Sequence, residues 1–159
     1  MKPLEEMLDE IGPYSVIGKS WNTTRAAEVA EPYYFFGCIL GMNGFSIFSS
    51  HETATEFEIS IRECIMNAAE HGNHYDKNKW IHLNFYVGKK GMVAEIEDEG
   101  EGVPEKIIKT FDLNPYNEEF IYMGGDRGHG FNGLKMRLER GELSGLGIHK
   151  STVYFMALF

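Results

Sequence analysis

Apolar and polar positions repeat with the period of an α-helix between residues 49 and 72. The apolar face consists of Phe57, Ile61, Cys64, Ile65 and Ala68. A second stripe is polar and consists of Glu56, Ser60, Glu63, Asn67, Glu70 and His71. Ser49 and Glu52 have the spacing of a capping box, and Gly72 with Asn73 suits a helix end. The pattern predicts one long amphipathic helix.

Alternation with a period of two follows this helix and predicts a β-hairpin. Residues 81–87 alternate between apolar and polar, residues 88–91 have the composition of a turn, and residues 92–97 form the return strand. A further helix is predicted over 131–139, and residues 151–159 are apolar on both faces, as in a covered strand. This order predicts an α/β (α+β) two-layer sandwich, with a mostly antiparallel sheet and helices on one face.

Other stretches give mixed signals. Residues 14–17 resemble a strand and residues 24–30 a helix, whereas residues 33–42 fit either, because periodicity does not decide short apolar runs. Residues 105–127 are also mixed and end in a glycine-rich loop. No repeat or linker divides the chain, so we expect a single domain over residues 1–159.

Composition narrows the choice of partners. The chain has 159 residues, 43% of them hydrophobic, and a formal net charge of −9. An acidic surface disfavours nucleic acid or an anionic membrane as the main partner and favours basic protein surfaces. Cys38 and Cys64 lie in apolar surroundings, which indicates buried thiols in a reducing compartment. With no signal peptide and no stretch able to span a bilayer, we expect a cytoplasmic protein.

The first candidate for chemistry is the pair Glu63 and Asn67 on the long helix. Residues four apart project from the same side of a helix, one turn from each other. A carboxylate and an amide so placed can serve as a base and as a neutral oxygen ligand for Mg²⁺. The alternative is that this stripe is only the solvated face of an amphipathic helix.

The second candidate is the run from Glu97 to Pro104, at the end of a predicted strand. Asp98 lies where the strand gives way to a turn, and Gly100 and Gly102 allow the backbone to approach a flat ligand closely. A carboxylate there can accept a hydrogen bond from the exocyclic amine of adenine, which guanine lacks at that position. An ordinary acidic turn is the alternative.

The third candidate is the glycine-rich run over residues 124–133, which opens the second predicted helix. Backbone N–H groups and the helix dipole at such a start favour phosphate binding. Gly128 to Gly133 also match the dinucleotide fingerprint G-x-G-x-x-G, but no strand directly precedes them and no acidic residue follows about twenty positions later. A phosphate-binding loop is therefore predicted without a dinucleotide fold.

The three clusters, in this order, resemble the motifs of the histidine-kinase-like (GHKL) ATPases, and specifically the anti-sigma-factor serine/threonine kinase branch. The N box of that branch matches Glu63 to Gly72, its G1 box Asp98 to Gly102, and its G2 box Gly128 to Phe131. The terminal strand is similar at Ser151 to Tyr154. The likeness runs from about residue 45 to the C-terminus and implies a Bergerat-type ATP-binding fold.

The resemblance implies a role for each matching residue. Glu63 would be the catalytic base, Asn67 the Mg²⁺ ligand, and Asp98 the group that reads the adenine amine of ATP. Residues 105–127 would form an ATP lid. The other implied ATP contacts are His71, Gly100, Gly102, Arg127, Gly128, His129, Gly130, Phe131 and Thr152. Among them, Thr152 would assist at adenine, and the two histidines would lie at the rim of the pocket.

The resemblance also implies an ATP-dependent protein kinase that binds a sigma factor or similar regulator and phosphorylates a serine of an antagonist, with a homodimer as the expected assembly. The branch often carries an arginine two residues before the first G2 glycine, where this chain has Asp126; Arg127 is one residue late. This departure leaves open a nucleotide-gated binding module that holds ATP without phosphoryl transfer. A catalytic domain related to sensor histidine kinases is a third possibility, suggested by His51.

Overall fold

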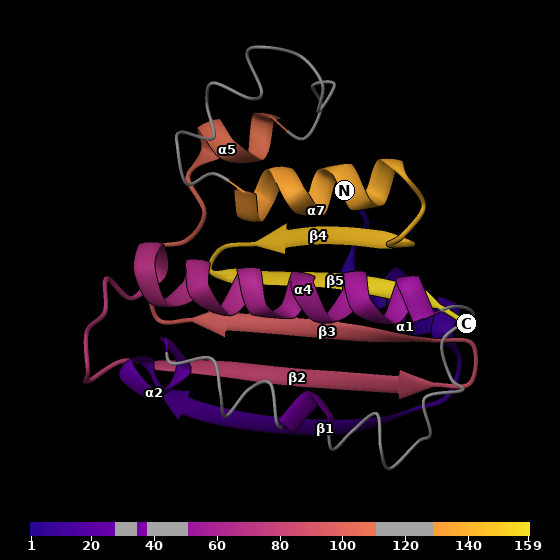
Figure 1. Ribbon diagram of the computed structural model, residues 1–159, viewed down its shortest axis with the longest axis horizontal. Helices are drawn as coiled ribbons and strands as arrows, with labels where there is room; N and C mark the ends of the chain where they lie inside the picture. The colour runs from indigo at the N-terminus through magenta and orange to yellow at the C-terminus, as the bar shows by residue number, and fades with distance from the viewer. Residues whose placement is uncertain (28–34, 38–50, 111–128) are drawn as a thin grey trace.

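The structure is a computed structural model that describes residues 1–27, 35–37, 51–110 and 129–159. The described residues form a five-stranded antiparallel sheet with helices packed on it, in the strand order β1-β2-β3-β5-β4 (Figure 1). The strands are β1 (Tyr14–Asn22), β2 (Trp80–Gly88), β3 (Gly91–Asp98), β4 (Gly145–His149) and β5 (Thr152–Leu158). The helices are α1 (Leu4–Ile11), α2 (Thr23–Ala27), α4 (His51–Asn67), the π-helix η2 (Ala68–Gly72), α5 (Glu105–Thr110) and α7 (His129–Glu139). The two-layer α+β fold class is confirmed.

Helices α4 and α7 lie on one face of the sheet (Figure 1). The predicted apolar stripe of α4 is buried from Phe57 to Ala68. It packs against alternate strand residues, namely Ile81, Leu83, Phe85, Ala94, Ile96, Val153 and Phe155. Because burying apolar surface is worth about 25 cal/mol per Å², this stripe fixes which side of α4 faces the sheet. The polar stripe of the same helix is left to face α7 and solvent.

Helix α1 packs on the opposite face and was not predicted from the sequence pattern. Met7 and Ile11 are fully buried there, against Val93, Tyr154 and Met156. The prediction that the helices lie on one face of the sheet therefore holds for α4 and α7 but not for α1. Strand β4 was also missed, because it is only five residues long and two of them are glycine, which disfavours strands.

The long helix ends differently from expectation. It was predicted to run to Gly72, and its last five residues instead form the π-helix η2. There the backbone N–H of Asn73 donates to the Ala68 oxygen at 2.8 Å, five residues back. Such wider turns are rare and frequent at functional sites. This one lies within the predicted N box.

Several predicted features lie outside the described residues: the cap serines, Cys38, most of the run over 33–42, and residues 111–127 of the expected lid. Helix α5 occupies the first six lid residues. Burial raises the pKa of the Cys64 thiol, which keeps it in the unreactive protonated form. Among the helices that the structure describes, none is long and apolar enough to cross a membrane.

Candidate functional site

The first and second sequence clusters touch where η2 ends. Asp98 closes β3, and a methyl carbon added at Gly72 would lie only 2.3 Å from Asp98 Cγ. One added at Gly100 would lie 2.3 Å from the backbone oxygen of Gly72. Both distances are far below van der Waals contact, so glycine is needed at both positions. The end of the N box and the carboxylate bend are therefore built against each other.

Asp98 lies on the face of the sheet that carries α4, because it continues the alternation of the buried residues Ala94 and Ile96. Its Oδ1 accepts a hydrogen bond from the backbone N–H of Gly100 at 2.7 Å. Burial raises the pKa of the Asp98 carboxyl, and this hydrogen bond opposes the rise. Within the described residues Oδ2 has no hydrogen-bond partner, so that oxygen remains available to a ligand.

The second half of the bend is fixed to the turn between β4 and β5. Gly102 has a φ of +98°, and a methyl carbon there would lie 3.0 Å from the backbone of Lys150. The N–H of Val103 donates to Lys150 O at 3.0 Å, and the N–H of Asp98 donates to Ser151 O at 3.2 Å. From the sequence, Gly100 and Gly102 were predicted to allow the close approach of a ligand. The structure adds an internal reason, since Gly100 and Gly102 each let two segments of backbone meet.

Asn73 connects these segments, although the sequence pattern predicted it only as the end of a helix. Asn73 is fully buried, and its Nδ2 donates to Thr23 Oγ1 at 2.8 Å and to Trp80 O at 2.9 Å. Its Oδ1 accepts from the backbone N–H of Glu99 at 2.9 Å. The amide thus ties η2 to α2, to β2 and to the residue directly after Asp98. Its position beside a predicted site was the only signal available in the sequence.

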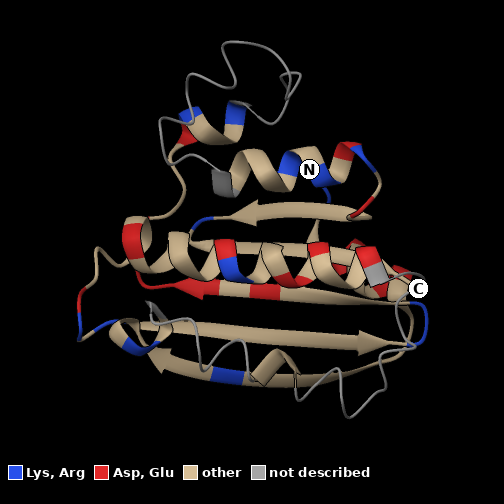
Figure 2. Cartoon of the chain, in the orientation of Figure 1, with Lys and Arg blue, Asp and Glu red and all other residues tan. Residues whose placement is uncertain are grey.

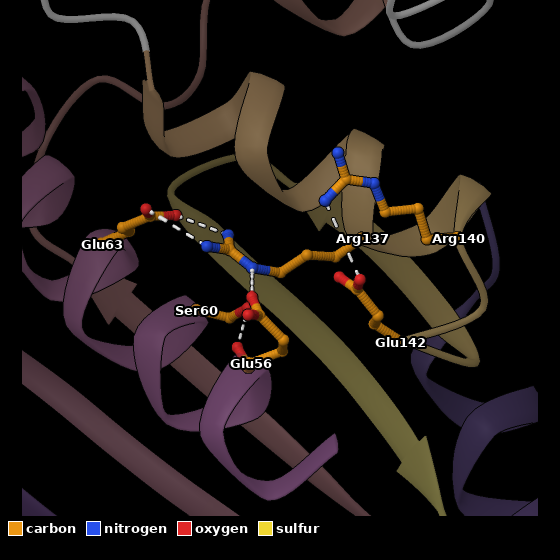
Figure 3. A network of polar contacts seen from close by, with 6 residues as sticks. All are labelled: Glu56, Ser60, Glu63, Arg137, Arg140 and Glu142. Atoms are coloured by element: carbon orange, nitrogen blue, oxygen red, sulfur yellow. Dashed lines mark hydrogen bonds and ion pairs between the residues drawn. The ribbon is translucent and has the colours of Figure 1, made fainter. Parts of the chain in front are cut away.

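Glu63 projects from α4 toward α7 and forms an ion pair with Arg137 (Figure 3). Arg137 Nη1 donates to Glu63 Oε2 at 2.7 Å, and Nη2 reaches Oε1 at 3.4 Å. Arg137 Nε donates to Glu56 Oε2 at 2.7 Å. Burial alone would lower the pKa of Arg137, but hydrogen bonds to the two carboxylates reverse the effect and raise it. Sequence reasoning did not identify Arg137, because its partners Glu63 and Glu56 are 74 and 81 residues away in the chain.

Asn67 and His71 follow Glu63 along the same helix. Asn67 is the last residue of α4, one turn beyond Glu63, and is half-buried. Its side-chain amide makes no hydrogen bond to any described residue, which leaves its oxygen free for a ligand. His71 is exposed on η2, in agreement with a position at a rim.

The third cluster is described only in part. Arg127 and Gly128 lie outside the described residues, and His129 and Gly130 are the first residues of α7. Phe131 is half-buried against the core. A methyl carbon added at Gly133 would lie 3.0 Å from Glu63 Oε2. The long helix with η2 therefore contacts the second cluster at Gly72 and the third at Glu63.

Thr152 lies on the other face of the sheet from Asp98. The buried residues Val153 and Phe155 face α4, so Thr152 alternates with them and shares its side with Tyr154, which packs toward α1. Ser151 lies in the turn just before β5, and its backbone oxygen accepts a hydrogen bond from the N–H of Asp98. The described contacts therefore join Asp98 to the backbone of Ser151, whereas Thr152 remains a predicted adenine contact on the other face of the sheet.

Acidic residues recur along α4 and β3 (Figure 2). The described residues contain no group of three or more His, Cys, Asp or Glu that could by itself hold a metal ion. A cation bound near Asn67 would thus need phosphate oxygens to complete its shell, as Mg²⁺ bound with ATP does. The unpartnered amide of Asn67 and the free Oδ2 of Asp98 fit a magnesium ion and an adenine amine, respectively.

Comparison with known proteins agrees with this geometry. The profile of the family described as "Histidine kinase-like ATPase domain" matches residues 45–149, more than half of the chain. None of the curated proteins compared with the chain matches it. The match spans the Glu63–Asn67 helix, the Asp98 bend and the start of α7. The chain belongs to the histidine kinase-like ATPase domain family and is accordingly an ATP-binding protein.

Proposed function

We propose that this protein is an ATP-dependent serine/threonine protein kinase that acts as an anti-sigma factor in a partner-switching system. The observation that carries the proposal is the placement of Glu63 and Asn67 one turn apart on α4, on the helix whose end packs against Asp98. A base and a metal ligand on one helix would then lie near an adenine-reading carboxylate at the end of β3, because the end of that helix packs against Asp98.

The nucleotide would bind with its base at the bend and its phosphates near α7. Asp98 Oδ2 would accept the hydrogen bond of the adenine amine, with a hydroxyl from Ser151 or Thr152 beside it. Backbone N–H groups at the start of α7 would hold phosphate oxygens, with Gly128 and Gly130 permitting the approach. Asn67 would hold Mg²⁺, which neutralises phosphate charge when bound.

In the transfer step the hydroxyl oxygen of a partner's serine attacks the γ-phosphorus. A new O–P bond forms, the bond from that phosphorus to the oxygen of ADP breaks, and the serine proton passes to Glu63. The half-buried Glu63 side chain, 23% exposed, is accessible to such a hydroxyl. ATP and a serine-bearing protein supply every atom of the products.

The partners we propose are a sigma factor or similar regulator and an antagonist with a phosphorylatable serine. A chain with net charge −9 suits a basic protein surface better than nucleic acid or a membrane. A homodimer in the cytoplasm is the expected state by family resemblance.

The proposal is tested by incubating the protein with magnesium, γ-labelled ATP and candidate antagonists. Wild type should label a serine, and Glu63→Gln should reduce the rate at least about a hundredfold, the range of general-base effects. Glu52→Gln is the matched control, since Glu52 is an exposed glutamate on the same helix. Equal rates for wild type and Glu63→Gln would remove Glu63 as the base.

The displaced lid arginine favours a second candidate, a module that binds ATP and changes partners without transferring phosphate. In that case bound ATP stays intact for hours with each candidate partner present, while partner affinity still differs between the ATP and ADP forms. Recovery of unchanged ATP from the complexes distinguishes the two functions.

A further inference from the structure

The two carboxylate oxygens of Glu63 differ in their contacts: Oε2 is tightly hydrogen-bonded to Arg137, and Oε1 is only weakly bonded. Arg137 Nη1 lies 2.7 Å from Oε2, a short charge-assisted hydrogen bond, whereas Nη2 lies 3.4 Å from Oε1, at the limit of hydrogen bonding. Oε1 therefore keeps most of its capacity to accept a proton. The carboxylate is oriented by one oxygen and available through the other.

Arg137 is itself anchored from behind. Its Nε donates to Glu56 Oε2 at 2.7 Å, and Glu56 lies two helical turns before Glu63 on the same side of α4 (Figure 3). The Arg137 side chain is only 11% exposed, so this geometry is sheltered from solvent. A planar guanidinium bound at both edges cannot rotate without breaking a charged hydrogen bond.

The sequence of α7 makes room for the arrangement. A methyl carbon at Gly133 would lie 2.8 Å from Arg137 Nη1 and 3.0 Å from Glu63 Oε2. Glycine in a helix interior is unfavourable compared with alanine, so its presence here needs a reason. Space for the Glu63–Arg137 pair supplies that reason.

From these contacts we propose that Arg137 is a positioning residue for phosphoryl transfer: it holds Glu63 Oε2 so that Oε1 faces the incoming hydroxyl, with Glu56 and Gly133 maintaining its place. The inference rests on the proposed function, since it presumes that Glu63 is the base. It assigns to α7 a role in the transfer step separate from phosphate binding at the start of that helix.

The experiment measures kcat, KM for ATP and the dissociation constant of ATP for full-length variants, using transfer to the antagonist and hydrolysis of ATP as parallel assays. Arg137→Met should lower kcat about tenfold to a hundredfold, with ATP affinity within about twofold of wild type. Arg140→Met is the matched control: Arg140 lies three residues later, directly after the end of α7, contacts Glu142 instead, and the variant should retain wild-type kcat.

A double-mutant comparison separates positioning from a structural role. If Arg137 acts through Glu63, Arg137→Met should add less than about twofold to the loss already caused by Glu63→Gln. Losses that multiply would overturn the proposal, as would a wild-type kcat for Arg137→Met while Glu63→Gln is impaired. If Glu63→Gln itself has no effect, the proposed role of Glu63 fails, and the assignment of Arg137 fails with it.

Gly133→Ala keeps the test decisive if Arg137→Met does not fold. The added methyl group meets the far end of a flexible arginine, which can shift, and alanine favours the helix. We expect a melting temperature at or above that of wild type, together with a several-fold lower kcat and little change in ATP affinity. A stable Gly133→Ala variant with wild-type kcat would contradict the need for the Glu63–Arg137 geometry.

Discussion

The two ends of the candidate site are built by different means. At the end proposed to bind the adenine base (the base end), Gly72, Asp98 and Gly100 meet through backbone atoms and a short carboxylate. Both polar groups of the Asn73 side-chain amide are hydrogen-bonded to neighbouring segments there. At the end proposed for phosphoryl transfer (the transfer end), Glu63 and Arg137 meet through the tips of long side chains.

This difference indicates which part of the candidate site can accommodate an added atom by moving side chains. An atom added at Gly100 meets the backbone of Gly72, which can move only with the whole segment. An atom added at Gly133 meets the tip of the long Arg137 side chain, which can shift, although only by giving up a charged hydrogen bond. We therefore expect the base end to be preorganised and the side chains of the transfer end to be adjustable, as the proposed kinase activity would need when an acceptor hydroxyl arrives on a separate protein.

The largest effect that would sharpen this contrast is expected for Asn73→Ala. Loss of the amide removes three hydrogen bonds in a fully buried position, at about 1 kcal/mol each, so the free energy of unfolding should fall by roughly 3 kcal/mol. Urea denaturation measures it. Asn78→Ala, at an exposed position nearby, is the control and should change stability little. Similar values for both variants would contradict a rigid base end.

The next effect comes from adding one methyl group at each end. Gly100→Ala forces a carbon to within 2.3 Å of the Gly72 backbone oxygen, and the free energy of unfolding should fall by about 2 kcal/mol, within the range for overpacking. Gly37→Ala is the control, because no atom of the described residues lies within 4 Å of its added carbon. If Gly100→Ala were as stable as Gly133→Ala, the distinction between backbone and side-chain contacts would fail.

A smaller effect is expected for Asp98→Asn, measured by calorimetry with ATP, ADP and GTP. Exchanging a carboxylate acceptor for an amide should weaken ATP binding about tenfold, the equivalent of about 1.4 kcal/mol for a charged hydrogen bond. Wild type should prefer ATP to GTP. Equal affinity of wild type for the two nucleotides would exclude Asp98 from the adenine site.

The same variant has a stability signature with a defined sign. Because burial raises the folded-state pKa of Asp98, its protonated form favours folding at low pH. That contribution is present below the ordinary aspartate pKa and is lost as pH rises through the raised one. Asp98→Asn should lack this loss, so the difference in unfolding free energy between variant and wild type should shift in favour of the variant as pH rises across that window.

The smallest expected effect separates two adjacent hydroxyls. Ser151→Ala should weaken ATP binding about threefold to fivefold, from one neutral hydrogen bond of roughly 1 kcal/mol, and Thr152→Ala less than twofold. The reason is that the backbone of Ser151 is hydrogen-bonded to Asp98, whereas the Thr152 side chain lies on the opposite face of the sheet. A larger loss from Thr152→Ala would restore the assignment made from the sequence resemblance.

The sequence by itself determined the elements whose signals are local. The period of the apolar residues predicted α4 and its buried face, alternation predicted the β2–β3 hairpin, and the order of three short motifs indicated the family. These features depend on residues close together in the chain, where spacing translates directly into geometry. Glu63, Asn67 and Asp98 were predicted as site candidates in this way.

Only the tertiary structure decided the contacts between distant segments. Arg137 reaches Glu63 and Glu56 across more than seventy residues, Asn73 reaches Thr23 across fifty, and the side of the sheet that Thr152 faces depends on which neighbours are buried. No local period encodes such pairings, because they arise when burial of separate apolar faces brings the segments together. The candidate site residues could be predicted from the sequence. The neighbours proposed to orient their side chains could be identified only from the packing of α4 and α7 on the sheet.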